Sequence, residues 1–414
     1  MFLYDYITEK IQNNSIFFNY IFSGRPKKEK DGVLDNLLQI INDKRKYKSY
    51  FCENPAPSVK GYLRVMDRHK FHHLSDDWDI FIPNGYNKIE EDLKDFIPQR
   101  DDQIILAIPG CDNIVSKANI WTLLENKYGR EKAKEIMPET FVLDNQSHME
   151  LFEKMHVDGN MYIMKKKKQR KEGLLLTKSL EDVKDGISKE YTIVQNYNRN
   201  VLLVNDRKVN LRVYLMLTIQ NSEVKAYVNK YGNCIYNNKT YDDSVMDFES
   251  NITSFNLSLD IYDKNPLTIK QLKTYLLDKG YENPDILFER LDEKVRLMCD
   301  AVKDSIGTNK EMEKNLCIQI FGMDFIVDKD LNPYLLECNK GPDMTPKIDT
   351  TYAKIINNLE KFYENESIVD KSYPDGYKSG NGLKVQRDMF KFLNIIEEID
   401  VKDNGFYEVY SGKK

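Results

Sequence analysis

Apolar residues along this chain follow two periods, and each period predicts a different kind of element. Spacings of three and four residues predict helices, whereas strict alternation predicts strands with one buried face. Helices are expected over 88–96, 117–136, 146–156, 268–279, 284–306, 350–364 and 386–396. Strands are expected over 61–66, 78–82, 103–108, 139–143, 161–165, 173–177, 191–196 and 208–220, and hairpins over 223–236 and 317–339.

This order of elements predicts an α/β (α+β) protein built from several units. We expect a helical extension over 1–48 and a small N-terminal α/β domain over 49–138. Two strand-rich units follow, over 139–200 and 201–364, and a C-terminal extension occupies 365–414. With 414 residues the chain is long enough for two or three cores.

Composition narrows the classes of function. Lys and Arg number 61 against 66 for Asp and Glu, and this net charge of −5 argues against a dedicated nucleic-acid binder. The six cysteines include no Cys-x-x-Cys pair, so neither a disulfide framework nor a structural zinc site is expected. No apolar run approaches the ~18 residues of a membrane span, and the start of the chain lacks a secretory signal. We therefore expect a cytoplasmic protein that binds no membrane, and we expect a monomer.

The strongest chemical signal is a predicted hairpin whose turn ends at Asp328 and Pro333. If these two residues oppose each other, Asp324 faces Glu337, and Asn339 points to the same side of its strand as Glu337. Carboxylate and amide oxygens suit Mg²⁺, which usually also binds substrate phosphates. An ordinary solvated hairpin with charged outer positions is the alternative.

A second signal is the alternation in the strand predicted over 208–220. Lys208, Asn210 and Arg212 share one face and offer two cations and an amide to an anion. The alternative is a sheet with one wet face.

A third signal is a run of basic residues after the strand that ends at Lys165. Five of the six residues over 166–171 are Lys or Arg. Such a segment is suited to closing over a triphosphate or to contacting an acidic polypeptide or nucleic acid. A solvated hairpin tip is an equal alternative.

Together these segments resemble the tubulin–tyrosine-ligase-like family of ATP-grasp carboxylate–amine ligases. Six motifs follow one another in the family's order between about residues 60 and 350. They are a Pro-Gly before a helix led by a basic residue (108–124), a Pro-Glu-Thr segment (137–143), an aromatic-Ile-x-Lys strand (162–165), a hinge similar to Val-x-Gln-x-Tyr (193–197), a basic strand ending in Leu-Arg (206–212) and a Gly-x-Asp … Leu-x-Glu-x-Asn hairpin (322–339).

The resemblance implies an ATP-grasp fold that holds ATP between two β-sheet units, the central domain 139–200 and the C-terminal domain 201–364. It implies a ligase that uses ATP and Mg²⁺ to join an amino acid to a carboxylate of a protein or peptide. The acceptor carboxylate would attack the γ-phosphate to give an acyl phosphate, and the amine would then displace phosphate. The implied partners are an amino acid and an acidic acceptor, with tubulin as the family's best-known example.

The resemblance also implies roles for individual residues. The metal ligands would be Asp324, Glu337 and Asn339, and the catalytic residues Lys208 and Arg212. The nucleotide would be bound by Lys117, Lys165, Gln195, Asn196, Tyr197, Lys208 and Thr253. Of the adenine contacts, those from positions 196 and 197 would come from the backbone. Independently of the resemblance, the basic segment 166–171 carries more cations than a triphosphate already faced by Lys117, Lys165, Lys208 and Mg²⁺ requires. We therefore expect it to serve the acceptor rather than the nucleotide.

Three departures from the family's pattern keep other functions open. Asn210 stands where the family usually has Asp, Ile235 stands where an Arg is expected, and Ser254 follows Thr253 in place of Asn. One alternative is a non-catalytic ATP-grasp descendant that binds an acidic protein tail. Another is a ligase that acts on small molecules.

Overall fold

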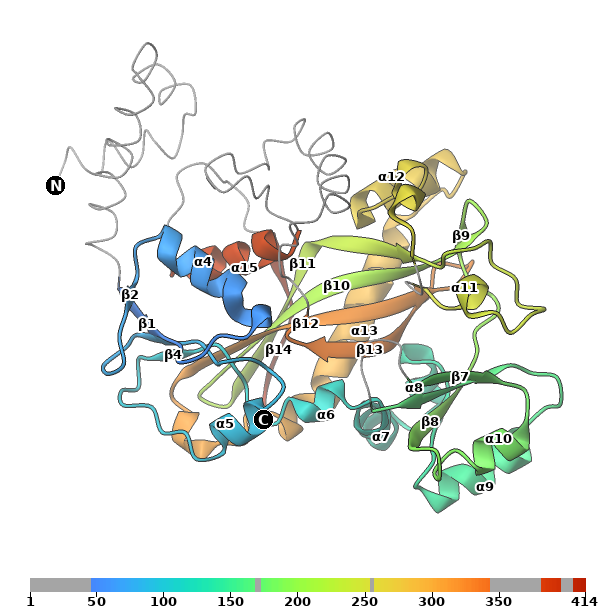
Figure 1. Cartoon of the computed structure of the whole chain (residues 1–414), viewed down its shortest axis with the longest axis horizontal. Coiled ribbons are helices and arrows are strands. Elements are labelled where there is room, and N and C mark those ends of the chain that lie inside the picture. The colour runs from blue at the N-terminus through green and yellow to red at the C-terminus, as the bar shows by residue number, and fades with distance from the viewer. Residues whose placement is uncertain (1–45, 168–172, 254–256, 343–380, 396–404) are drawn as a thin grey trace, which may run out of the picture.

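The structure is a computed structural model in which helices flank two β-sheets (Figure 1). It describes residues 46–167, 173–253, 257–342, 381–395 and 405–414. The helices predicted within 1–48 and over 350–364, and residues 168–171 of the basic segment, lie outside that description. Within the described part of the chain, no helix combines the length and apolar character needed to cross a membrane.

The larger sheet joins strands from distant parts of the sequence. Among the described residues it has ten strands in the order β14-β11-β10-β12-β4-β3-β1-β2, with β13 beside β12 and β9 beside β10. Strand β12 is shared, because its first two residues pair with β4 and residues 321–327 pair with β13. The strands are β1 (Ser49–Phe51), β2 (His72–His73), β3 (Ile80–Phe81), β4 (Ile104–Ile105), β9 (Leu203–Val204), β10 (Arg207–Gln220), β11 (Glu223–Tyr236), β12 (Leu316–Val327), β13 (Pro333–Lys340) and β14 (Phe406–Lys413).

The smaller sheet lies within the predicted central domain and has the order β5-β8-β6-β7. Two helices cover one of its faces, where Phe152 and Val183 pack against Tyr162, Met164 and Val194. The elements are β5 (Thr140–Val142), α9 (Gln146–Met155), β6 (Tyr162–Lys166), β7 (Leu174–Thr177), α10 (Leu180–Lys184) and β8 (Tyr191–Asn196).

The other face of the small sheet turns toward the larger unit. Met161, Ile163 and Leu176 pack there against Ile252, which follows the short helix α11 (Phe248–Asn251). The small sheet therefore lies beside the large one, and β6 and β8 contribute side chains to the region between them.

The remaining helices support the large sheet. Helix α13 (Asp285–Val302) lies behind the sheet in Figure 1, and its predicted stripe from Leu287 to Val302 is buried. The others are α4 (Lys60–Arg68), α5 (Ile89–Lys94), α6 (Asp112–Val115), α7 (Lys117–Tyr128), α8 (Arg130–Ile136), α12 (Ile269–Asp278) and α15 (Asn381–Phe392).

The predicted strand over 61–66 is wrong, because these residues belong to helix α4. Tyr62, Val65 and Met66 are all buried, and their spacing of three and four residues places them on one helical face. The alternation in this short window was a coincidence of a few apolar positions.

The predicted hairpin over 223–236 is also wrong. Strand β11 runs through the whole segment and pairs with β10 on both sides of an irregularity. The register shifts between the pairs Arg212–Asn233 and Tyr214–Asn229, so the polar residues in between form a bulge rather than a turn.

Candidate functional site

The three predicted metal ligands lie together on the hairpin of β12 and β13. Asp324 pairs with Glu337 across the two strands, as the sequence predicts. The amide of Asn339 donates to Glu337 over 3.3 Å and to the carbonyl oxygen of Gly322 over 3.4 Å. Two carboxylates and an amide are thus gathered at one point of the sheet.

The turn of this hairpin differs from the prediction by one residue. Pro333 pairs with Val327 and not with Asp328. The predicted pairing of the carboxylates is nevertheless correct, because Leu336 is an extra residue in β13 and shifts the register back. No sequence pattern indicates this β-bulge. The one-residue error in the turn and the extra residue Leu336 shift the register in opposite directions and cancel.

Each carboxylate of the hairpin has its own cation. The guanidinium of Arg212 donates to both oxygens of Asp324, over 2.6 and 2.9 Å. Lys117, the first residue of α7, places its Nζ 3.0 Å from an oxygen of Glu337. Arg212 lies directly opposite Asp324 in the sheet, so one row across β10, β12 and β13 carries a cation and two anions.

The pKa values of the two carboxyl groups are pushed apart. Burial favours the neutral form of Glu337, but the charges of Lys117 and Lys165 outweigh it and hold its pKa below the usual value. Burial raises the pKa of Asp324, and Arg212 opposes that rise. Glu337 is therefore a carboxylate at neutral pH, as a metal ligand must be.

Lys165 enters the site from the small sheet. Its side chain is buried and donates to Oε1 of Gln195 over 2.7 Å. Burial, together with repulsion from Lys117, lowers the pKa of Lys165 to about 8. The amide of Gln195 in turn donates to Thr140 and to the carbonyl of Pro138, so this glutamine orients the lysine.

Lys208 reaches the same region from the large sheet. Its Nζ lies 3.1 Å from the carbonyl oxygen of Asn251 and 4.6 Å from the centre of the Tyr197 ring. Burial and the nearby charge of Lys165 lower its pKa to about 7. Lys208 and Asn210 are buried and Arg212 is partly exposed, so most of this face is covered by other parts of the protein rather than open to water.

Asn210 lies between Lys208 and Arg212 on β10. Its amide nitrogen donates to the hydroxyl of Thr253 over 2.8 Å, so the structure brings these two predicted residues together. Its Oδ1 is buried and has no hydrogen-bond partner among the described residues. A buried acceptor without a partner is costly, which indicates that a ligand donor belongs there.

The predicted adenine-binding segment forms the end of β8. The backbone N–H groups of Asn196 and Tyr197 already donate to the carbonyls of Glu139 and Met161. Hydrogen bonds from this segment to a purine would therefore use its carbonyl oxygens. The hydroxyl of Tyr197 donates to Asn251, so the ring is held beside Lys208.

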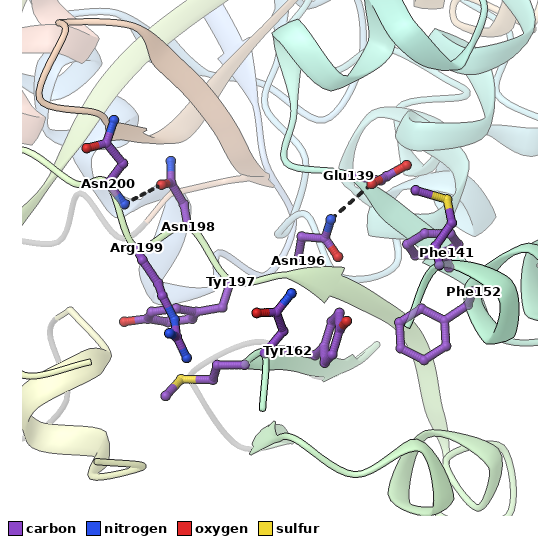
Figure 2. A pocket seen from close by; sticks show the side chains of 12 residues that line it. Glu139, Phe141, Phe152, Tyr162, Asn196, Tyr197, Asn198, Arg199 and Asn200 are labelled. Carbon is purple, nitrogen blue, oxygen red and sulfur yellow. Dashed lines mark hydrogen bonds between the residues drawn. The ribbon is translucent and has the colours of Figure 1, made fainter. Parts of the chain in front are cut away.

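A cavity of about 380 Å³ opens at this end of β8 (Figure 2). Figure 2 shows Tyr197 and Arg199 at one end and the rings of Phe141 and Phe152 at the other. Phe141 and Phe152 belong to the core on the helix-covered face of the small sheet. The cavity thus lies beside the hinge, at the end of β8 and at the start of β6.

Two further residues hold the site together, and the sequence analysis did not identify their roles. The fully buried Asn251 donates from its amide to three backbone carbonyls, of Asp242, Val245 and Asp247. Glu139 accepts from Asn196 and from Arg130. Glu139 lies in the matched Pro-Glu-Thr segment, but its partners Arg130 and Asn196 could not be foreseen from it. Asn251 has no sequence signal, because its partners are backbone carbonyls.

Comparison with known proteins identifies the family. A model described as the tubulin-tyrosine ligase family matches residues 96–362, well over half of the chain. The chain belongs to this family. Membership confirms the resemblance and, with the two adjacent sheets, the predicted α/β ATP-grasp fold.

Relatives within the tubulin-tyrosine ligase family are distant. The chain is 28% identical over 183 residues to the rat protein named probable tubulin polyglutamylase TTLL9, covering 42% of this chain and 38% of that protein. It is 23% identical over 412 residues to Tetrahymena thermophila probable alpha-tubulin polyglutamylase Ttll1, covering 88% of this chain and 95% of that protein. Drosophila melanogaster tubulin glycylase 3B is 27% identical over 209 residues, 46% of this chain and 27% of that protein. The chain thus spans well under half the length of the rat and fly relatives that it matches.

Proposed function

We propose that this protein is an ATP-dependent ligase that joins an amino acid to a carboxylate of an acidic protein. The observation that carries the proposal is the convergence of Asp324, Glu337 and Asn339 with buried lysines from both sheets. A reaction through an acyl phosphate needs charge neutralisation and alignment more than a strong base. A site of ammonium, guanidinium and carboxylate groups meets that need.

The residues present fit Mg²⁺. Asp324, Glu337 and Asn339 offer the oxygen ligands that this cation prefers, and Glu337 is ionised. Bound there, Mg²⁺ would neutralise phosphate charge and orient the γ-phosphate. Lys117 and Arg212, which now balance the two carboxylates, would then be available to anionic substrate groups.

The residues present also fit ATP. Lys165 and Lys208 are buried cations with lowered pKa values, and a triphosphate beside them would stabilise their charged forms. The free Oδ1 of Asn210 accepts only from an N–H or O–H group. Phosphate oxygens do not supply one, whereas ribose hydroxyls do, so Asn210 fits the sugar.

In the proposed reaction Arg212 holds the acceptor carboxylate and Lys208 holds the phosphate that leaves. The acceptor oxygen forms a bond to the γ-phosphorus and ADP leaves. The donor amine then bonds to the acyl carbon, its proton is lost and phosphate leaves. Lys208 and Asn210 are buried. The exclusion of water from their surroundings would protect the acyl phosphate from hydrolysis.

The partners in this proposal follow the named relatives. Two of the proteins described above are named tubulin polyglutamylases and one a tubulin glycylase. We propose that this chain, as a monomer in the cytoplasm, adds glutamate or glycine to an acidic acceptor such as tubulin.

The direct test is incubation with Mg²⁺, ATP, purified tubulin and each radiolabelled amino acid, with Glu337→Gln as the control. Label in tubulin that depends on ATP and on Glu337 supports the proposal. Absence of label from every amino acid in tubulin and in whole-cell extract contradicts it.

A non-catalytic descendant is the second candidate, and Asn210 in place of an aspartate favours it. A thermal shift with Mg²⁺ and ATP separates the two. Stabilisation by MgATP supports the ligase, and no change supports the descendant.

A further inference from the structure

The end of strand β13 is held by residues from the N-terminal part of the chain. Lys340, the last residue of β13, directly follows the candidate metal ligand Asn339. Its ammonium group forms an ion pair with the carboxylate of Asp112, the first residue of α6. Figure 1 shows α6 beside the end of β13. The ion pair thus connects the candidate metal hairpin to an element that lies 228 residues away in the sequence.

The ion pair between Lys340 and Asp112 is partly buried. The side chain of Lys340 is 10% exposed and that of Asp112 is 57% exposed. Lys340 has therefore given up most of its contact with water, and a buried ammonium group without a counter-charge is unfavourable. The carboxylate of Asp112 consequently fixes the direction in which the Lys340 side chain points.

Asp112 is itself positioned by Glu90, the second residue of α5. One oxygen of the Glu90 carboxylate accepts from the backbone N–H of Gly110 over 2.7 Å, and the other accepts from that of Asp112 over 3.0 Å. Hydrogen bonds to an ionised carboxylate are stronger than those between neutral groups. Glu90 therefore holds the backbone of Asp112, and the side chain of Asp112 holds Lys340.

A further contact fixes the residue that follows Lys340. Gly341 has a φ of +55°, and a Cβ atom placed on it would lie 2.3 Å from the ring of Tyr86. The ring is buried, and its hydroxyl donates to the carbonyl of Leu106 over 3.1 Å. Glycine suits this backbone conformation and this close approach. The chain is thus held against the N-terminal part of the protein on leaving β13.

These contacts bear on the candidate metal site because β13 carries two of its three ligands. Glu337 and Asn339 lie on the same strand as Lys340 and immediately precede the anchored end. Mg²⁺ requires near-ideal octahedral geometry, with oxygen ligands at about 2.0–2.1 Å. A small displacement of the end of β13 would therefore be enough to weaken metal binding.

We propose that Glu90, Asp112 and Lys340 are positioning residues that hold Glu337 and Asn339 in the geometry needed to bind a divalent cation. This inference rests on the proposed function, which places the cation at the hairpin of β12 and β13. The three positioning residues do not contact the cation in this assignment. They act through the backbone of β13.

Charge repulsion and positioning predict opposite effects for one substitution. Lys340 is a cation close to a candidate cation site, so the loss of its charge alone would strengthen metal binding in Lys340→Met. Positioning predicts that the same variant binds the metal more weakly, because the end of β13 loses its anchor. The direction of the change therefore distinguishes the two explanations.

The test measures the Kd for Mn²⁺ by electron paramagnetic resonance, with the full-length protein in excess over a non-hydrolysable ATP analogue. Mn²⁺ prefers the same kinds of oxygen ligand as Mg²⁺. We expect Lys340→Met and Asp112→Asn each to raise this Kd about fivefold, and Glu90→Gln to raise it at least twofold. The double variant Asp112→Asn/Lys340→Met should lose no more than either single variant, because the two residues act as one unit. Lys340→Arg keeps the charge and should retain the wild-type Kd within twofold.

The matched control is Lys314→Met. Lys314 also forms an ion pair with the N-terminal part of the chain, 2.9 Å from Asp101, but this pair is exposed and lies before the start of β12. The control is expected to change the Kd for Mn²⁺ less than twofold. An equal loss in Lys314→Met would show that any weakening of contacts with the N-terminal part has this effect, and it would overturn the inference.

The remaining outcomes separate this inference from the proposed function. Unchanged or tighter Mn²⁺ binding by a folded Lys340→Met protein would refute the positioning role, and so would losses in the double variant that multiply those of the single variants. If the wild-type protein is an active ligase in either case, the proposed function stands. A wild-type protein that ligates no amino acid, but shows the coupled loss of Mn²⁺ binding, would end the ligase proposal and leave the positioning role standing.

Discussion

Glu337 needs its negative charge for two interactions. It is paired with Lys117 in the structure, and it is the proposed ligand of a cation. The charges of Lys117 and Lys165 lower its pKa, so it carries this charge at physiological pH. The amide of Asn339 and the facing Asp324 keep it on the same side of the hairpin. Its replacement by the neutral isostere therefore isolates the effect of charge.

We expect Glu337→Gln to lower ATP turnover at least about 100-fold, the scale on which loss of one charge-stabilising group acts. Volume and backbone pairing are unchanged, so the melting temperature should shift by only a few degrees. Coupled ADP release and differential scanning fluorimetry measure the two effects. The exposed Glu131→Gln is the control, and full turnover in a folded Glu337→Gln protein would contradict the metal assignment.

Lys165 and Lys167 lie two residues apart and are expected to serve different ligands. Lys165→Met removes a buried, oriented ammonium group and should raise the Kd for MgATP about tenfold, which corresponds to about 1.4 kcal/mol. Lys167→Met removes an exposed ammonium group and should leave that Kd unchanged while weakening the binding of hexa-L-glutamate, a model of the acidic acceptor. Isothermal titration with each ligand tests this, and equal effects of both variants on MgATP would refute it.

The lowered pKa values of Lys165 and Lys208 predict proton uptake on nucleotide binding. In the free protein these groups have pKa values of about 8 and 7, below the usual 10.5. A triphosphate raises both values, so between about pH 7 and 8.5 binding takes up protons and the MgATP affinity falls as pH rises. Calorimetry at pH 8 in buffers of different ionisation enthalpy measures the uptake, and Lys208→Met should reduce it. Identical heats in all buffers would argue against charged lysines at the phosphates.

The lowered pKa values of Lys165 and Lys208 also predict how the stability of the nucleotide-free protein changes with pH. Unfolded lysines with a pKa near 10.5 bind more protons than these two buried ones over about pH 7 to 10. Their contribution to the free energy of unfolding therefore rises with pH across that window.

At the scale of elements, α11 acts through Asn251, its last residue. The side chain holds three backbone carbonyls of the preceding loop, and its own carbonyl accepts from Lys208. The element thus fixes one of the proposed phosphate-binding residues from outside the sheet.

We expect Asn251→Ala to lower the free energy of unfolding by about 3 kcal/mol, because several buried carbonyls lose their donors. The MgATP affinity should fall as well, since Lys208 loses its orientation. Urea denaturation and nucleotide titration measure both effects. The exposed Asn283→Ala is the control, and an Asn251→Ala protein with wild-type stability would show that these hydrogen bonds do not form.

At the scale of the whole molecule, the chain's last residues complete the large sheet. Strand β14 pairs with β11 from Glu223 to Asn229. Tyr407 and Tyr410 bond to Asp292 and Asp300 on α13. This strand therefore ties the sheet to its supporting helix.

Deletion of residues 405–414 is expected to lower the melting temperature by several degrees and to cause self-association. It would expose the edge of β11, whose unpaired backbone groups are a template for other chains. Size-exclusion chromatography and a thermal scan measure both effects. The Tyr407→Phe/Tyr410→Phe variant keeps the strand and should stay monodisperse, and a monodisperse deletion protein would contradict this role.

Much of the site was predictable because it lies in regular strands. Alternation placed Lys208, Asn210 and Arg212 on one face, and the structure confirms that they share it. The pairing of Asp324 with Glu337 was also correct, although it depends on a bulge that cancels an error in the turn. The assignment of functional roles to these residues stays a prediction, as does the division of the chain into five segments.

The sequence by itself determined the local periods, and with them most strands, the long helix α13 and the family. These features depend on neighbours a few residues apart, whose side chains either share a face or do not. Only the tertiary structure decided which cations meet which carboxylates, that Lys165 and Lys208 are buried side by side, and that α6 lies beside the end of β13. Contacts between residues 117 and 337, or 208 and 251, depend on how whole elements pack, and no local pattern records that packing.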